Sequence, residues 1–372
     1  MSQPVLVVTG ATGFLGRELV HHLLGEDPAV RLALLVRGRD AADARARGLA
    51  VLADRLAGEA LAAAERRVEI VRADLEQERL GLDAAAHAAL AERTTGVIHG
   101  AASVSFALPL AQARAINVEG TRRMLDLARA AGCPFDYVGT AYVAGDRSGT
   151  AYEGELDVGQ GFHNTYEQTK LEAEALVRAR AKEQPAAIYR PSIIVGDSAT
   201  GRTASFKVLY WPLKIFTRGF RLAPGRPDAV MDVVPSDFVV RAICHLRKQP
   251  GRFGQAYHLC AGPERAASLQ QLGEVAAGFF GCKPPIFVEP KWFIKARPLV
   301  DRLTFGRLRR ILTTGRVYTP YLSLRLYFDT AVARAALGPV GIAAPGVEEF
   351  FVNQLRFARD TDWGKKLAHA ER

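Results

Sequence analysis

Short apolar runs alternate with longer amphipathic stretches through the first 190 residues of the chain. The apolar runs are residues 5–8, 31–36, 68–71, 97–99, 135–138 and 186–189. The stretches between them place apolar residues at helical spacing over residues 15–24, 41–67, 83–93, 110–131 and 165–183. Strands that alternate with helices are typical of βαβ units, whose right-handed crossovers build a parallel sheet with helices on both faces. The pattern therefore predicts an α/β fold with a doubly wound parallel sheet.

After Pro191 the alternation becomes irregular, and residues 196–231 are rich in glycine, aromatic and basic residues. A helix is predicted over residues 236–248, a strand over 256–259 and a second helix over 268–280. We expect residues 1–195 to form the doubly wound domain, with its sheet completed by about residues 232–262. Residues 196–372 are then a smaller C-terminal α/β lobe that covers the carboxyl edge of the sheet and binds the substrate.

The composition is that of a soluble folded protein, with 49% apolar and 24% charged residues. No basic segment precedes the first apolar run, and no uncharged apolar run approaches the roughly 20 residues of a transmembrane helix. The cysteines are far apart and form no CxxC pair; they are Cys133, Cys244, Cys260 and Cys282. Such cysteines are typical of reduced thiols in a cytoplasmic protein, so we expect neither a disulfide framework nor a metal site.

The net charge of +10 is concentrated in one part of the chain. Residues 283–325 hold ten Lys and Arg residues and two acidic ones. This local excess predicts an anionic partner: a phosphate-bearing substrate, an acidic protein, or a membrane surface that the protein contacts peripherally. A solvated basic face above core aromatic residues is the competing interpretation. No nucleic-acid-binding module accompanies the charge, so nucleic acid is not an expected partner.

Three glycines spaced by two residues follow the first apolar run, at Gly10, Gly13 and Gly16. Gly10 permits a tight turn, Gly13 lets the backbone approach a pyrophosphate, and Gly16 lets the next helix pack against the strand. The amino end of that helix then offers unpaired N–H groups and a positive dipole to phosphates. Because a predicted strand precedes the glycines and a predicted helix follows, the pattern indicates a dinucleotide site.

The second strand ends at Arg37, where an acidic residue would suit the ribose 2′-hydroxyl of NAD(H). A basic residue suits a 2′-phosphate instead, so Arg37, helped by Arg39, favours NADP(H); a solvated arginine at a strand end is the other interpretation. Ala101 and Ala102 follow the fourth strand and are small enough to let a cofactor lie close. We expect His99, which precedes them, to be a packed core residue.

Tyr166 and Lys170 stand four residues apart at the start of a predicted helix, so they share one face. A nearby cation lowers the pKa of a phenol from about 10, which would let Tyr166 exchange a proton with a substrate oxygen while a nicotinamide exchanges hydride. The hydroxyl of Thr140, just past the fifth strand, can hold that oxygen. An exposed helix pair and a turn threonine are the alternative interpretations. The order of glycine turn, strand-end hydroxyl and YxxxK helix favours the catalytic one.

With these residues the chain resembles the extended short-chain dehydrogenases/reductases over about its first 260 residues, and within them the thioester-reductase and fatty-acyl-CoA-reductase branch. The segments that carry the resemblance are residues 9–16, 35–37, 74–75, 80–82, 97–106, 117–121, 139–143, 166–170 and 189–196. The long segment 38–66 between the second and third strands is also similar to this branch. The resemblance implies a Rossmann fold of the extended type.

The resemblance also implies roles for individual residues. Thr140, Tyr166 and Lys170 would be catalytic, and Asn117 would support a proton relay. The residues that would line the cofactor are Gly10, Thr12, Gly13, Phe14, Leu15, Gly16, Arg37, Asp74, Leu75, Ala101, Ala102, Tyr166 and Lys170, with Pro191 and Ser192 flanking the nicotinamide. The chain departs from the branch at Gly139, where relatives often have serine, and its last hundred residues match only loosely.

The leading hypothesis is therefore NADPH-dependent reduction of an acyl thioester, carried by coenzyme A or an acyl carrier protein, to an aldehyde or an alcohol. No adenylation or carrier domain is recognised in the chain, so the thioester would arrive on another molecule, and no cysteine nucleophile is needed. The first alternative keeps the fold but takes a ketone or hydroxyl substrate, such as a sterol, a hydroxy-ketone or a sugar nucleotide. The second is a non-catalytic dinucleotide sensor, which would not need all of Thr140, Tyr166 and Lys170.

Overall fold

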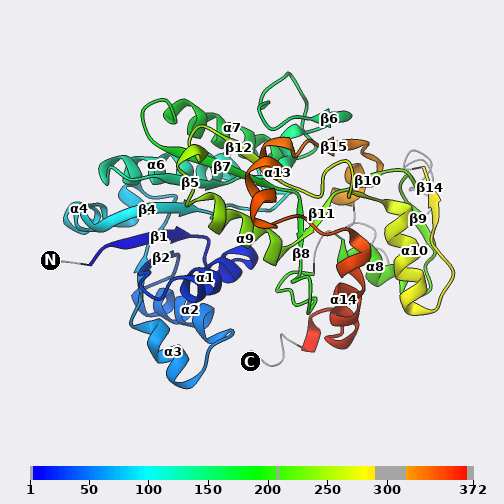
Figure 1. Ribbon diagram of the computed structural model, residues 1–372, viewed down its shortest axis with the longest axis horizontal. Coiled ribbons are helices and arrows are strands. Elements are labelled where there is room, and N and C mark those ends of the chain that lie inside the picture. The colour runs from blue at the N-terminus through cyan, green and yellow to red at the C-terminus, as the bar shows by residue number, and fades with distance from the viewer. Residues whose placement is uncertain (1–2, 207–208, 290–315, 367–372) are drawn as a thin grey trace.

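The computed structural model describes residues 3–206, 209–289 and 316–366, and at the centre of these ranges lies a sheet of seven parallel strands (Figure 1). The strands are β1 (Val5–Thr9), β2 (Leu32–Val36), β3 (Val68–Arg72), β4 (Thr94–His99), β5 (Phe135–Val138), β7 (Ala186–Pro191) and β12 (Ala256–Leu259). Their order is β12-β7-β5-β4-β1-β2-β3. The predicted doubly wound sheet is confirmed. Because the strand order reverses between β1 and β4, a ligand crevice is expected at the carboxyl ends of these two strands.

Helices cover both faces of the sheet. One face carries α1 (Phe14–Glu26), α2 (Ala41–Ala53), α3 (Gly58–Glu65) and α9 (Ser236–Leu246), and the other carries α4 (Ala84–Arg93), α6 (Gly120–Ala130) and α7 (Thr165–Arg180), with α5 (Leu110–Arg114) beside α7. Successive strand residues alternate between the two layers. Val8 packs against α1 in one core, whereas Val7 packs in the other. Strands buried on both faces explain the continuous apolar runs of the sequence.

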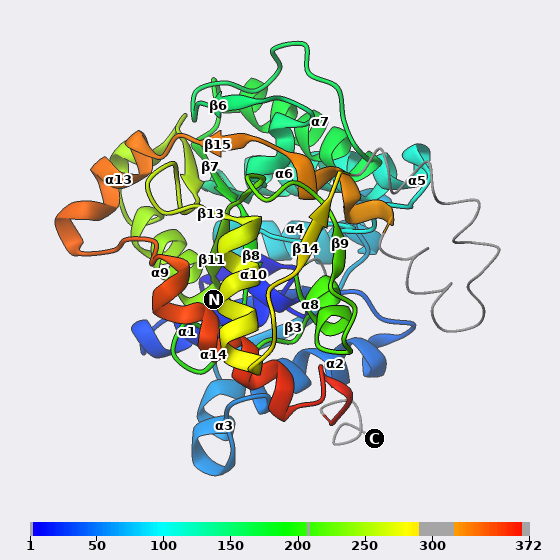
Figure 2. The ribbon, with the colours of Figure 1, turned by 90° about the vertical axis from the view of Figure 1, so that its right-hand side faces the viewer.

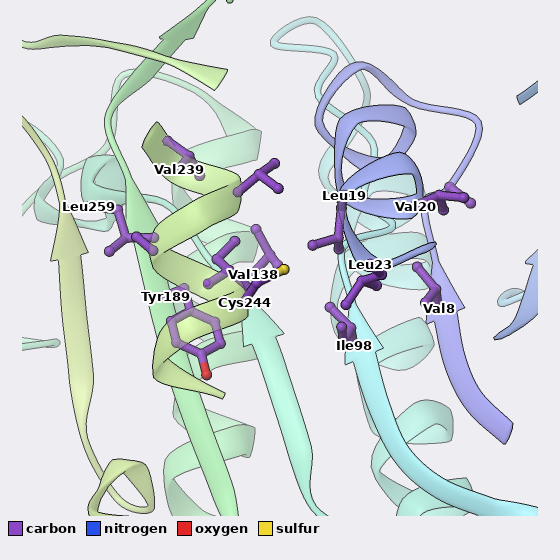
Figure 3. Packing of buried hydrophobic residues seen from close by; sticks show 14 of the residues in the cluster. Val8, Leu19, Val20, Leu23, Ile98, Val138, Tyr189, Val239, Cys244 and Leu259 are labelled. Carbon is purple, nitrogen blue, oxygen red and sulfur yellow. The ribbon is translucent and has the colours of Figure 1, made fainter. Parts of the chain in front are cut away.

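The core between the sheet and the first helical layer joins segments that are distant in the sequence (Figure 3). Leu19 and Leu23 of α1 lie on the side of that helix toward α9, where Cys244 is, and both helices pack onto the same sheet. The chain therefore returns to the sheet after its irregular segment, with α9 on its face and β12 at its edge. Burial of these large apolar side chains stabilises the return by about 1.5–3 kcal/mol each.

Two predicted helices are interrupted. The stretch 41–67 divides into α2, which ends at Ala53, and α3, which begins at Gly58 with a positive φ of 54°. The stretch 110–131 contains a π-helical turn, η2 (Ala115–Glu119), between α5 and α6. Such turns are often found at functional sites, and this one carries Asn117.

The remaining elements form short sheets and a third core. The strands pair as β6 (Gly149–Ala151) with β15 (Leu326–Phe328), β8 (Ile193–Val195) with β11 (Val233–Pro235), β9 (Leu222–Pro224) with β14 (Ile286–Val288), and β10 (Val230–Met231) with β13 (Ala267–Ser268). The third core joins α8 (Tyr210–Phe216), α10 (Leu269–Phe280) and α14 (Val347–Asp360), which lie on the face seen in Figure 2. Near β12 lies α13 (Ala331–Leu337). The 3-10 turns are η1 (Glu78–Gly81), η3 (Ala141–Ala144), η4 (Pro250–Arg252), η5 (Arg316–Ser323) and η6 (Gly338–Val340).

Most of the basic stretch, residues 290–315, lies outside the described residues, so its expected anionic partner remains a prediction. In the part of the chain that the structure describes, no helix is both long and apolar enough to cross a bilayer.

The carboxylate of Glu153, which follows β6, ties α13 to the edge of the sheet. It accepts the backbone N–H of His258 in β12 at 2.8 Å, and those of Val332 and Ala333 at 2.6 and 3.0 Å. Val332 and Ala333 stand in the first turn of α13, where N–H groups have no partner within the helix. Because Glu153 is buried, water cannot replace these contacts.

We expect Glu153→Ala to lower the free energy of unfolding by about 3–5 kcal/mol, because it leaves three backbone donors unpaired in the interior. Urea denaturation followed by circular dichroism measures the change. Glu264→Ala is the matched control, since Glu264 is exposed and forms only a surface ion pair with Arg334. An equal loss in the two variants would contradict the role given to Glu153.

Candidate active site

A cavity of about 620 Å³ runs along the carboxyl ends of the central strands, at the point where the strand order reverses. Every residue predicted to line a cofactor lines this cavity, and so do Thr140, Tyr166 and Lys170. Asn117 and Arg39, the expected helper of Arg37, do not line it. Segments separated by more than 150 residues in the sequence therefore meet at one crevice.

The turn between β1 and α1 is built by close backbone packing. Gly10 has a φ of 76°, and a Cβ placed on it would lie 2.7 Å from the backbone N of Ala101 and the carbonyl C of Gly100. A Cβ on Gly16 would lie 2.0 Å from the carbonyl O of Gly10. Gly13 is the N-cap of α1 and supplies no side-chain cap, so the first N–H groups of the helix stay available at the cavity wall. This cradle fits a dinucleotide pyrophosphate.

His99 supports the turn from behind. Its Nδ1 lies 2.7 Å from the hydroxyl of Thr9, which in turn accepts the N–H of Ala101 at 3.2 Å, and its Nε2 lies 3.0 Å from the hydroxyl of Thr121. Burial lowers the pKa of His99 to about 3, so the imidazole is neutral. The histidine is a packed core residue, as expected from the sequence.

Two arginines line the cavity near the end of β2, one just after the strand and one on the helix that follows. Arg37 is largely exposed, and its guanidinium lies 3.4 Å from Glu76. Arg47, from α2, also lines the cavity and donates a hydrogen bond to the carbonyl O of Arg37. Arg39, the helper expected from the sequence, is instead paired with Asp43 and is not part of the lining. The second cation at this end of the cavity is therefore Arg47, which the strand-end argument missed because it lies on the following helix.

Tyr166 and Thr140 meet in the cavity, the first from α7 and the second from the end of β5. The side chain of Thr140 lies near the Tyr166 hydroxyl, and its own hydroxyl accepts the N–H of Tyr142 at 3.3 Å. Burial raises the pKa of Tyr166 to about 12, and the neighbouring Thr140 side chain offsets this only in part. The lowering expected from Lys170 is not observed, because burial of the phenol dominates its environment. Tyr166 therefore keeps its proton at neutral pH.

Lys170 lies one turn along α7 and is itself buried. Its Nζ donates to the carbonyl O of Val138 at 2.9 Å and lies 4.3 Å from the centre of the Tyr137 ring. Burial lowers the pKa of Lys170 to about 7, while the carboxylate of Glu174 opposes that shift. The ammonium is thus held in place by the strand that carries Thr140.

Asn117 is buried next to the site but faces the protein. Its side-chain amide donates to the carbonyl O of Ser103 at 3.2 Å and to the hydroxyl of Thr169 at 3.0 Å, and its Oδ1 accepts the N–H of Ser103 at 2.7 Å. Both amide hydrogens are occupied, so these contacts fix the loop after β4 to α7. The proton-relay role implied by the resemblance stays a prediction.

The cavity also has an aromatic wall that the sequence did not indicate. Phe106 lies against both Tyr166 and Tyr321, each at 5.7 Å between ring centroids, and Tyr142 meets Tyr321 edge-on at 5.3 Å. Phe106 and Tyr142 fall inside segments that resemble the family, but Tyr321 lies in the loosely matching C-terminal part. No spacing rule connects residue 321 to residue 166, so only the folded chain brings them together.

Among the described residues, one group of side chains has the composition of a metal site: His22, Glu26 and Cys244. Its ligand atoms lie within 4.8 Å of one another, on α1 and α9, and none of the three residues lines the cavity. Lys248 already binds Glu26 at 2.7 Å, and burial raises the pKa of the Cys244 thiol to about 12. Both features oppose a bound cation, and the expectation of no metal stays a prediction.

Residues 8–243 match the family described as male sterility protein. The chain is 30% identical over 271 residues to the nonribosomal peptide synthetase asaC of Aspergillus flavus, covering 69% of this chain and 26% of the synthetase. It is 27% identical over 270 residues to the fatty acyl-CoA reductase wat of Drosophila melanogaster, covering 63% of this chain and 52% of that protein. The chain therefore spans only part of the length of these relatives.

Among solved structures, the chain is similar to the terminal R domain from the myxalamid PKS-NRPS biosynthetic pathway. The TM-score is 0.84 with 27% sequence identity, and the match covers 98% of this chain and 92% of that domain. The likeness thus extends through the C-terminal part, where the sequence alone matches loosely.

We expect Gly16→Ala to weaken dinucleotide binding at least about tenfold, or about 1.4 kcal/mol, because the new methyl group pushes α1 away from the Gly10 turn. Fluorescence titration with NADPH measures the dissociation constant. Gly25→Ala, in the same helix, is the matched control, since a Cβ there meets nothing within 4 Å. Unchanged affinity in the Gly16 variant would show that the turn does not carry the cofactor.

Proposed function

The chain belongs to the male sterility protein family, in the thioester-reductase branch of the extended short-chain dehydrogenases/reductases, and from this premise we propose that it reduces an acyl thioester with NADPH. The family makes it an oxidoreductase that uses a nicotinamide dinucleotide. The observation that carries the proposal is the meeting of Thr140, Tyr166 and Lys170 in the same cavity as the glycine turn. The relatives include a peptide synthetase and a fatty acyl-CoA reductase, which supports a thioester as the substrate.

In this proposal a bound NADPH supplies the hydride that reduces the thioester carbonyl. The hydroxyls of Thr140 and Tyr166 hold the carbonyl oxygen and stabilise the negative charge that develops on it. Tyr166 then donates its proton to that oxygen, for which its raised pKa keeps it in the protonated form. We assign two roles to Lys170: it holds the cofactor, and its positive charge stabilises the negative charge left on the phenol of Tyr166.

After hydride addition and protonation, the former carbonyl carbon bears a hydroxyl group and the sulfur of the carrier. The carbon–sulfur bond then breaks and the hydroxyl proton passes to the departing sulfur, which leaves an aldehyde and a free thiol. One thioester, one NADPH and one proton are thus converted into one aldehyde, one thiol and one NADP+. None of the described residues that line the cavity is a cysteine, so the acyl group stays on its own carrier during the reaction. A second round of hydride transfer would convert the aldehyde into an alcohol.

The direct test is incubation of the purified protein with NADPH and lauroyl-CoA or a lauroyl-loaded carrier protein, with detection of aldehyde and alcohol. The two thioesters distinguish the carriers.

We expect Tyr166→Phe to lower kcat by about 10²–10⁴-fold, because the proton donor is lost, while the affinity for NADPH stays the same. Tyr152→Phe is the matched control, since Tyr152 is exposed and lies outside the cavity. Turnover of a ketone but of neither thioester would replace the thioester by the ketone alternative; a folded protein that binds NADPH without any turnover would favour the sensor.

We propose NADPH as the preferred cofactor because Arg37 and Arg47 both line the cavity at the end of β2. Arg37→Gln should raise the dissociation constant of NADPH at least about tenfold and leave that of NADH nearly unchanged, since only NADPH carries the 2′-phosphate. Arg39→Gln is the control, because Arg39 is turned toward Asp43. The assignment fails when the Arg37 variant weakens both cofactors equally.

A further inference from the structure

Tyr321 lines the cavity and belongs to η5 (Arg316–Ser323), which begins more than 25 residues after the end of β14. Its ring contacts Phe106, Tyr142 and His163, with centroid distances of 5.7, 5.3 and 5.5 Å. Phe106 is at the same time in contact with Tyr166. The Tyr321 ring therefore closes the cavity on the side of the proposed proton donor, one aromatic ring away from it.

The hydroxyl of Tyr321 is anchored to the start of α7. It donates a hydrogen bond to Glu167 and accepts one from the side-chain amide of Asn164 at 2.7 Å. Glu167 is completely buried, and its other oxygen accepts the N–H of His163 at 2.8 Å. A buried carboxylate that lost one of these donors would be poorly solvated. The position of the Tyr321 ring is thus tied to the residue that follows Tyr166 in the sequence.

Charge is unevenly distributed along the described lining of the cavity. Arg37, Arg47, Asp74 and Glu76 stand at the ends of β2 and β3 and on α2, and Lys170 stands at the centre. The ring contacts of Tyr321 are Phe106 and Tyr142, which line the cavity with it, and His163, whose side chain is paired with Glu167. A charged group placed against the rings of Phe106, Tyr142 and Tyr321 would lose hydration without gaining an opposite charge from them.

We propose that Tyr321 is a specificity-determining residue that selects an apolar acyl group, and that Glu167 is a positioning residue that holds the Tyr321 ring in place. The inference rests on the proposed function and names the class of acyl group that it takes. An alkyl chain packs against the rings of Tyr321 and Phe106, which places the carbonyl next to Tyr166. An acyl group that ends in a carboxylate is rejected, because its charge would be buried without a partner.

The test compares heptanoyl and adipoyl thioesters of pantetheine, which have similar length and differ in the terminal methyl or carboxylate group. We expect the unmodified protein to favour heptanoyl by at least about tenfold in kcat/KM. Tyr321→Ala should reduce this preference to within about twofold, because the wall is opened to water, while the dissociation constant of NADPH stays unchanged. Tyr152→Phe, an exposed tyrosine outside the cavity, should keep the full preference.

The anchor is tested by Tyr321→Phe, Glu167→Gln and the double variant. Each single change should raise KM for heptanoyl pantetheine with little effect on kcat, and the double variant should be no worse than either single one, because both remove the same contact. Additive effects would overturn the positioning role of Glu167. Tyr321→Gln, which keeps much of the side-chain volume and brings a polar amide to the wall, replaces the alanine variant where that variant does not fold, and must likewise lose the preference.

The outcomes separate this inference from the proposed function. If the unmodified protein produces neither aldehyde nor alcohol from any thioester, the proposed function fails. If it reduces heptanoyl and adipoyl pantetheine equally well, or if Tyr321→Ala keeps the preference, the assignment of Tyr321 is overturned while the thioester activity stands.

Discussion

The close packing of the β1–α1 turn against the end of β4 is the constraint on which the site depends. Gly10 approaches Gly100 and Ala101 so closely that no side chain fits between them, and Gly16 approaches Gly10 in the same way. This packing brings the amino end of α1 to the switch point of the sheet. The unpaired N–H groups of that helix then face the same crevice as the side chains at the ends of β5 and β7.

Burial governs the electrostatics at the centre of the crevice. It raises the pKa of Tyr166 and lowers that of Lys170, so both shifts favour the neutral form of the group. A protonated Tyr166 suits the proposed reduction, because that reaction consumes a proton at the substrate oxygen. The neighbouring Thr140 side chain partly offsets the effect of burial on Tyr166, and the proposed mechanism places both hydroxyls on one substrate oxygen.

Buried carboxylates connect the C-terminal part of the chain to the sheet and to α7. Glu153 binds β12 and the first turn of α13, and Glu167 binds Tyr321 of η5. Glu174 pairs with Arg190 of β7 at 2.6 Å in the same interior. Each carboxylate is surrounded by donors, which is the condition under which a charge can be buried without a large loss of stability. The shape of the substrate end of the cavity therefore depends on polar contacts rather than on apolar packing alone.

The sequence by itself determined the sheet, the glycine turn and the identity of the residues around it. These features follow from local rules: apolar runs buried on both faces, glycines where backbones touch, and a four-residue spacing that places Tyr166 and Lys170 on one face of α7. The tertiary structure decided what depends on contacts between distant segments. Arg47 replaces Arg39 beside Arg37, Asn117 turns toward Ser103 and Thr169, Tyr321 closes the cavity, and the pKa of Tyr166 rises. No periodicity encodes these outcomes, because the burial and the partners of one residue are set by side chains far away in the chain, as in the contact between Phe106 and Tyr321.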